Sequence, residues 1–256
     1  MAAIAFFPFT FIDIPGVACA FTSRRGGVSE PPHDSANLSY EVGDDAEAVR
    51  ENRRLIFHRL GLAGWCELKQ VHGDVIRFDP TPTPPEPPAT LEGDGLTTAE
   101  PGVGLVIKTA DCQPILLAHR SGNYIAALHA GWRGNRINFP GSGVTRFCER
   151  YNLDPADIYA VRGPSLGPSA AQFVNFTTDF GPDFTPYFDP ERQTMDLWRL
   201  TRDQLQDAGV PGTQIFGIDL CTMGMDDTFF SYRKACASPV NATGRQAGVI
   251  WIRPQA

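Results

Sequence analysis

The sequence has 256 residues, 42% of them hydrophobic and 20% charged, so it is long enough to bury a core of its own. A formal net charge of −7 argues against a nucleic-acid partner, which would require clustered excess lysine and arginine, but it still allows a local arginine site for a small anion. The six cysteines form no C-x-x-C pair, and we expect reduced thiols in a cytoplasmic protein.

The first twenty residues are apolar and end in Ala-Cys-Ala, which resembles a signal-peptide cleavage site. They contain no basic region, and Pro8, Asp13 and Pro15 interrupt the apolar run. We therefore expect two short strands joined by a turn at Ile14–Gly16. No segment approaches the ~20 consecutive apolar residues of a membrane helix, so no membrane partner is expected.

The spacing of apolar residues predicts a helix over Asp44–Leu62, with an aspartate at its start and Gly61 near its end. Six prolines then fall between Pro80 and Pro88, which predicts an exposed, extended surface loop over residues 80–90. Because the apolar pattern resumes at once, this loop is not expected to divide the chain into two domains.

The rest of the chain alternates irregularly between short apolar runs and amphipathic segments. The runs rich in Val, Ile and Leu predict strands at Val103–Lys108, Ile115–Ala118, Tyr124–Leu128, Ile158–Val161, Gln214–Leu220 and Gly248–Ile252. Amphipathic helices are predicted over Val144–Tyr151 and Asp196–Ala208. Since there is no strict βαβ repeat, we expect one α+β or mixed α/β domain over residues 1–256, with a mixed β-sheet core flanked by helices.

Three short motifs concentrate potential metal ligands: KQVHGD with His72, TADCQP with Cys112, and HAGWRG with His129. Two imidazoles and one thiolate suit zinc, and copper in some conditions, while three protein ligands leave one position open for catalysis. The long separations match no zinc-finger spacing, so only the fold could bring the three together. Taken singly, Cys112 could be a core thiol, His129 a structural histidine and His72 a turn cap.

A second group of residues could bind an anion or move protons. Arg24, Arg133 and Arg233 each lie beside glycine, aromatic or small residues, and arginine binds phosphate or carboxylate with two hydrogen bonds. Ordinary solvated surface charge is the alternative. Asp94 and Asp111 could orient a metal-bound histidine, exchange protons with a substrate, or simply cap turns.

Motifs of a known family occur here in that family's order, from about residue 16 to residue 252. They include FTSRRGGVS, SANLSYEVGDD, KQVHGDVI, TADCQP, ALHAGWRG, RGPSLGP, CTMGMDDTFFSYRK and ATGRQAGVIWI. On these residues the sequence resembles the laccase-domain (polyphenol-oxidase-like, YfiH-like) family of purine nucleoside phosphorylases.

The resemblance implies a mixed α/β domain with zinc on the same two histidines and one cysteine. It also implies phosphorolysis of adenosine, inosine, guanosine and methylthioadenosine, with deamination of adenosine, so the partners would be a purine nucleoside and phosphate. By motif position, Arg24, Asn37, Arg133 and Arg233 would surround the substrate. Arg133 and Arg233 would hold phosphate.

Two further expectations concern the residues of the reaction, the first from the residue types and the second from a departure from the family pattern. Asp111 or Asp94 would handle protons in the reaction. The family usually has a glutamate where this chain has Gln172, which can keep a hydrogen bond to the substrate but not a charge.

Other functional classes stay open at this point. A multicopper laccase needs about ten ligands, mostly imidazole, and the chain has five histidines, although one copper ion could support weak oxidase activity. A cysteine hydrolase could use Cys112 as nucleophile, His129 as base and Asp111 to orient the base, which would also suit a peptidoglycan-editing amidase. A metal-bound thiolate is a poor nucleophile, so metal content distinguishes these enzymes. A binding module without catalysis fits the buried Cys and His residues least well.

Overall fold

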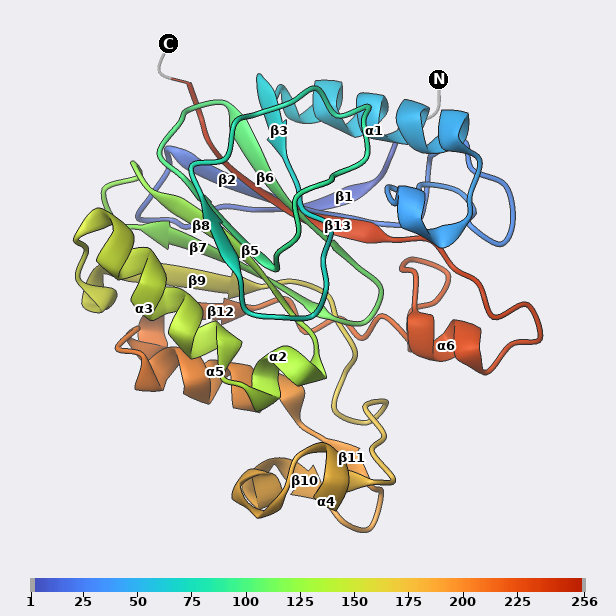
Figure 1. Cartoon of the computed structure of the whole chain (residues 1–256), viewed down its shortest axis with the longest axis vertical. Helices are drawn as coiled ribbons and strands as arrows, with labels where there is room; N and C mark the ends of the chain where they lie inside the picture. The colour runs from blue at the N-terminus through green and yellow to red at the C-terminus, as the bar shows by residue number, and fades with distance from the viewer. Residues whose placement is uncertain (1–2, 255–256) are drawn as a thin grey trace.

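The computed structural model describes residues 3–254, so the first and last two residues of the predicted 1–256 domain lie outside it. Most strands belong to two mixed sheets (Figure 1). The five-stranded sheet has the order β1 (Phe6–Phe9), β2 (Val17–Thr22), β13 (Gln246–Ile252), β6 (Val103–Thr109) and β3 (Gly64–Cys66). The six-stranded sheet has the order β12 (Ile215–Gly217), β9 (Ile158–Arg162), β7 (Gln113–His119), β8 (Ile125–Ala130), β5 (Gly95–Thr98) and β4 (Ile76–Phe78). Each sheet combines antiparallel pairs with parallel ones, β3 with β6 in the first and β4 with β5 and β9 with β12 in the second.

The two sheets pack face to face, and helices cover their outer faces (Figure 1). One apolar core lies between the sheets, with Leu105 and Ile250 from one sheet beside Leu116 and Ala127 from the other. A second core joins the five-stranded sheet to α1 (Ala46–Leu60), and a third joins the six-stranded sheet to α3 (Phe139–Tyr151) and α5 (Leu197–Asp207). The result is a mixed α/β domain with four layers, which confirms the predicted fold class.

The long helices begin and end where the sequence supplies caps. The Asp45 carboxylate accepts the backbone N–H groups of Glu47 and Ala48 at the start of α1, and Gly61 ends it with a φ of +66°. The predicted helix over Val144–Tyr151 is the second half of α3. Its first turn, with Pro140 and Gly141, has no clear helical signal in the sequence.

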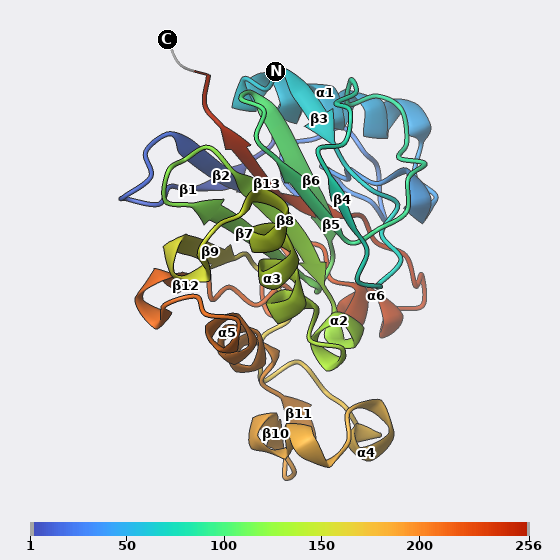
Figure 2. The ribbon, with the colours of Figure 1, turned by 60° about the vertical axis from the view of Figure 1, so that its left-hand side comes forward.

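Several short elements were not predicted. They are β3, β4, β5, α2 (Trp132–Arg136), α4 (Phe176–Asp179), β10 (Phe188–Asp189), β11 (Thr194–Met195) and α6 (Tyr232–Cys236), with 3-10 turns at Tyr40–Val42, Pro155–Asp157, Pro182–Tyr187 and Gly212–Gln214. The predicted strand Gln214–Leu220 is confined to the three residues of β12. Figure 2 shows α4, β10 and β11 in a small lobe beyond α5, which is held by its own aromatic cluster around Phe173 and Phe180.

The proline-rich segment 80–90 forms neither a helix nor a ladder. It touches the body of the domain through a bridge between Thr83 and Trp65, and through the carbonyls of Pro85 and Pro87, which accept hydrogen bonds from the buried Arg53. Among the described residues, no helix is both long and apolar enough to cross a membrane.

Candidate metal centre between two cavities

The three predicted metal ligands converge at the point where the two sheets meet. His72 lies in the loop between β3 and β4, Cys112 in the turn that leads from β6 of one sheet to β7 of the other, and His129 in β8. Their donor atoms all lie within 4.8 Å of one another, and Cys112 Sγ is 3.7 Å from His72 Nε2. His129 is buried, Cys112 half-buried and His72 exposed, so the cluster opens to solvent on one side.

One buried carboxylate, that of Asp94, fixes both histidines. Its Oδ1 accepts the Nδ1 proton of His129 at 2.8 Å and the backbone N–H of His72 at 2.9 Å, and its Oδ2 accepts the N–H groups of Val71 and Gly73. The first contact leaves His129 Nε2 free to bind a metal. Burial would raise the pKa of Asp94, but the hydrogen bond and charge of His129 and the backbone amides outweigh it and lower this pKa. Asp94 therefore orients the ligands as a carboxylate at neutral pH.

Cys112 and His129 form a charged pair in the metal-free protein. Burial alone would raise the pKa of the Cys112 thiol, but the charge of His129 and hydrogen bonds from both histidines lower it to about 6. Burial alone would lower the pKa of His129, but the Cys112 thiolate and Asp94 raise it to about 9. The thiolate that a metal requires is therefore already stable near neutral pH.

Gly131 is required by the close packing of this cluster. A Cβ atom at this position would lie 2.9 Å from Cys112 Sγ and 3.1 Å from His72 Cδ2, closer than side chains normally approach. The glycine also precedes α2, a short helix that begins at Trp132.

These donors fit one borderline-soft ion such as zinc or copper, with a coordination position left open on the solvent side. Within residues 3–254 they are the one group of three or more potential ligands, so the described chain does not build a multinuclear copper centre.

Two cavities meet at the cluster, and His72, Cys112 and Arg133 line both. The polar cavity, of about 440 Å³, is also lined by Ser39, Glu41, Lys69, Gln70, Lys108 and Arg245, among others. The aromatic cavity, of about 200 Å³, is also lined by Asp111, Trp132, Leu166, Phe173, Leu197 and Arg233, among others. The arrangement can therefore hold two different small molecules on either side of one metal ion.

Three of the other predicted site residues reach these cavities. The guanidinium of Arg133 lies 4.4 Å from the centre of the Trp132 ring. Arg233 donates from Nη1 to the carbonyl of Gln172 at 2.8 Å, a contact that any residue at position 172 would supply. Asp111 accepts hydrogen bonds from the Thr222 hydroxyl and from the backbone N–H of Arg233.

Two predicted substrate-binding residues are not found in the lining of either cavity. Arg24 is held by an ion pair with Asp34 and by the carbonyl of Asp226, and its guanidinium lies over the Phe230 ring. Asn37 is fully buried, and its amide oxygen accepts the backbone N–H groups of Ser39 and Arg245. Both residues hold loops in place, and their motif position alone could not show this.

Sequence reasoning also missed residues that line the polar cavity, chiefly Glu41, Gln70, Lys108 and Arg245. Lys108 gave a usable signal, because a lysine inside the apolar strand before Cys112 needs a buried partner. The structure supplies the buried carboxylate of Glu67 at 3.6 Å and the exposed one of Glu41 at 3.0 Å.

The fold and the site define a class, a mixed α/β protein with a solvent-facing His-Cys-His group that could hold a metal ion between two cavities. The chain belongs to the family described as multi-copper polyphenol oxidoreductase laccase, whose model matches residues 18–253. It is 36% identical over 249 residues to a protein of Escherichia coli K12 named purine nucleoside phosphorylase YfiH, covering 93% of this chain and 94% of that one. The crystal structure of YlmD from Geobacillus stearothermophilus superposes with a TM-score of 0.83 at 31% identity, covering 95% and 94% of the two chains. That of the hypothetical protein YfiH from Bacillus licheniformis gives 0.80 at 28% identity, covering 93% of each chain.

Proposed function

We propose that this chain is a zinc-dependent purine nucleoside phosphorylase, with a purine nucleoside and phosphate as its substrates. The observation that supports this most directly is the position of the His72, Cys112 and His129 cluster at the boundary of a polar and an aromatic cavity. The names of the relatives that align over nearly the whole chain point the same way.

In phosphorolysis a phosphate oxygen bonds to C1′ of the ribose while the C1′–N9 bond breaks, and its electron pair leaves with the base, which takes up a proton. Zinc, when bound, would supply Lewis acidity to a phosphate oxygen or to a water molecule. Copper would suit the same ligands, but the reaction transfers no electrons, so we assign zinc.

The residues of this chain take separate roles in the proposal. Arg133, which borders both cavities, would hold phosphate. Asp111 lines the aromatic cavity and would supply the proton to the leaving base, whereas Asp94 lines neither cavity. Arg233 would border the nucleoside.

The same site would also accept methylthioadenosine, because the aromatic cavity can enclose an apolar group beside the ribose. Deamination of adenosine would use water in place of phosphate: the water oxygen bonds to C6 while the C6–N6 bond breaks, and the amino group takes up a proton from the water and leaves as ammonia. Both activities belong to the proposal.

The test measures metal content together with two activities, phosphate-dependent release of free base from a nucleoside panel and phosphate-independent ammonia release from adenosine. His72→Ala should lose the metal and both activities, because both need the ion. His58→Ala is the matched control, since His58 is exposed on α1 and should leave both unchanged. Purified, zinc-loaded protein that releases no base in the presence of phosphate would refute the phosphorylase assignment.

A cysteine hydrolase is the second candidate, because the structure pairs the Cys112 thiol with a charged His129. Asp94, 2.8 Å from His129 Nδ1, would then orient the base instead of Asp111, which was expected in that role. Metal removal separates the candidates. Activity that survives complete chelation and is destroyed by alkylation of Cys112 favours the hydrolase, whereas activity that needs the ion favours the phosphorylase.

A further inference from the structure

The polar cavity contains more cationic than anionic side chains, and two of the cations have carboxylate partners. Lys69 pairs with Glu92 at 2.8 Å, and Lys108 pairs with Glu41 at 3.0 Å. Arg133 and Arg245 also line this cavity. Among residues 3–254, neither has a carboxylate oxygen within 4.0 Å of its guanidinium, so neither forms an ion pair.

Arg245 is the more firmly positioned of the two. Its Nη1 donates to the carbonyls of Thr243 and Gly244, at 3.1 and 2.9 Å. Its backbone N–H is held by Asn37 Oδ1 at 2.8 Å. Within the described residues its Nε and Nη2 have no protein acceptor. These two atoms form the edge of a guanidinium that matches two oxygens of one phosphate.

The position of Arg245 also disfavours an unpaired charge. Its side chain is half-buried, and this burial lowers the pKa of the guanidinium. The burial outweighs the nearby negative charges of Cys112, Asp111 and Glu41, which favour the cation, so a bound anion in direct contact would stabilise it further.

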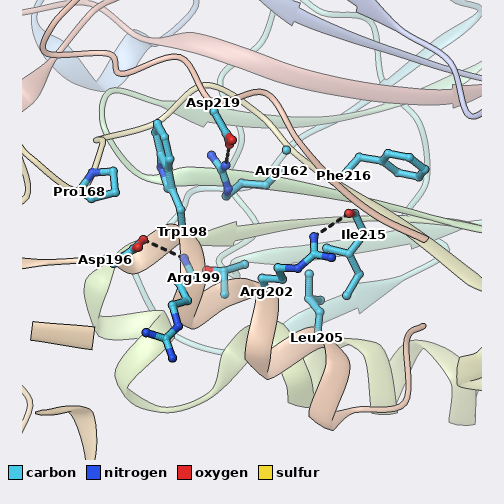
Figure 3. A pocket seen from close by; sticks show the side chains of 12 residues that line it. Arg162, Pro168, Asp196, Trp198, Arg199, Arg202, Leu205, Ile215, Phe216 and Asp219 are labelled. Atoms are coloured by element: carbon cyan, nitrogen blue, oxygen red, sulfur yellow. Dashed lines mark hydrogen bonds and ion pairs between the residues drawn. The ribbon is translucent and has the colours of Figure 1, made fainter. Parts of the chain in front are cut away.

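Another arginine-rich cavity, of about 270 Å³ between α5 and β12, provides a comparison (Figure 3). Its guanidinium groups are already occupied. Arg162 pairs with Asp219 and lies over the Trp198 ring, and Arg202 donates to the carbonyls of Ile215 and Gly212 at 2.9 and 2.7 Å. Cationic composition alone does not make that cavity an anion site.

We propose that Arg245 is the principal phosphate-binding residue, that phosphate occupies the polar cavity, and that the purine base occupies the aromatic one. The proposal rests on the phosphorylase function, because it assigns the two substrates of that reaction to the two cavities. Arg133, at the boundary, would touch phosphate beside the metal. The aromatic cavity suits a base, because Trp132 and Phe173 offer flat apolar surfaces there.

The test compares Arg245→Lys with Arg202→Lys in the full-length, zinc-loaded protein. Arg202 is the matched control, since it also donates to two backbone carbonyls but lies in the other arginine-rich cavity. Arg245→Lys should raise the KM for phosphate about 10-fold or more and change the KM for inosine less than about 2-fold, because lysine keeps the charge but loses the two-point contact. Arg202→Lys should change neither constant.

Calorimetric titration with inorganic phosphate alone gives a second reading. The wild type should bind phosphate without nucleoside, and Arg245→Lys and Arg245→Gln should lose most of this binding, Gln the more. Should one of these variants fail to fold, the other still gives this result.

If Arg245→Lys leaves the KM for phosphate unchanged, or raises the KM values for phosphate and inosine equally, the proposed role of Arg245 is wrong. Phosphorolysis by the wild type would still support the proposed function in that case. Wild-type protein without phosphorolysis would refute the proposed function itself. Phosphate binding that depends on Arg245 would even then support the anion site.

Discussion

At the scale of single residues, the space around Cys112 is as important as the ligands themselves. Gly131 lies so close to the cluster that we expect Gly131→Ala to displace Cys112 or His72 and to weaken zinc binding about 10-fold or more, the range seen when the surroundings of metal ligands are disturbed. The measurement is a competition titration against a chromophoric chelator.

Gly134→Ala is the control for this change. The nearest atoms to a Cβ at Gly134 are 3.8 Å away, and this glycine lies inside α2, where alanine is favoured by ~0.5–1 kcal/mol. Equal zinc affinity in the two variants would show that the cluster tolerates a methyl group and that the glycine is not required for packing.

The charged pair of Cys112 and His129 predicts an unusual pH dependence in the metal-free protein. Because the pKa of this thiol is lowered to about 6, alkylation by iodoacetamide should remain fast at pH 7 and fall only as the pH drops through about 6. An ordinary thiol would already slow below pH 9. His129→Ala removes the charge mainly responsible, so its midpoint should move well above 7.

Zinc should protect Cys112 at neutral and alkaline pH, since it binds the reactive sulfur there, and the protection should be lost at low pH as protons displace the ion. A midpoint near 9 in the metal-free wild type would contradict the charged pair.

At the scale of secondary structure elements, a buried arginine of α1 forms an ion pair and hydrogen bonds with the rest of the molecule. Arg53 is fully buried and pairs with Glu67 at 2.9 Å, while its guanidinium also donates to Leu38 and to the proline-rich segment. Arg53→Ala would leave Glu67 with the more distant Lys108 as its cationic partner, so we expect a loss of ~3–5 kcal/mol in the free energy of unfolding.

Urea titration monitored by circular dichroism measures this loss. Arg54→Ala, one position along the same helix, removes an exposed contact to Glu51 and should leave the midpoint nearly unchanged. Similar urea midpoints for the two variants would mean that the buried ion pair contributes no more to the free energy of unfolding than the surface ion pair does.

The elements that the sequence predicted well are those with caps or long apolar runs, such as α1, β6 and β7. Elements such as β3 and β4 have three residues each, too few to show a period. The start of α3 was hidden because proline and glycines, ordinarily helix breakers, occupy its first turn.

At the scale of the whole molecule, the sequence could not divide the strands between two sheets. Strands β2, β6 and β8 are buried along their whole length, because each sheet is covered by helices on one face and by the other sheet on the second. Without alternation of buried and exposed residues, a strand gives no sign of which sheet it joins. The sequence motifs identified His72, Cys112 and His129 as candidate site residues. Arg245 could be identified only from its position in the folded structure.

The ligands also lie far apart along the chain, with 40 positions between His72 and Cys112, yet their donor atoms meet at the junction of the two sheets. A bound ion would therefore act as a reversible cross-link that closes long loops. Such a link reduces the conformational entropy of any partly unfolded chain that still holds it. The ion at this junction would thus contribute both to catalysis and to the stability of the domain. Protein made where the metal is scarce would therefore be less stable as well as lacking its cofactor.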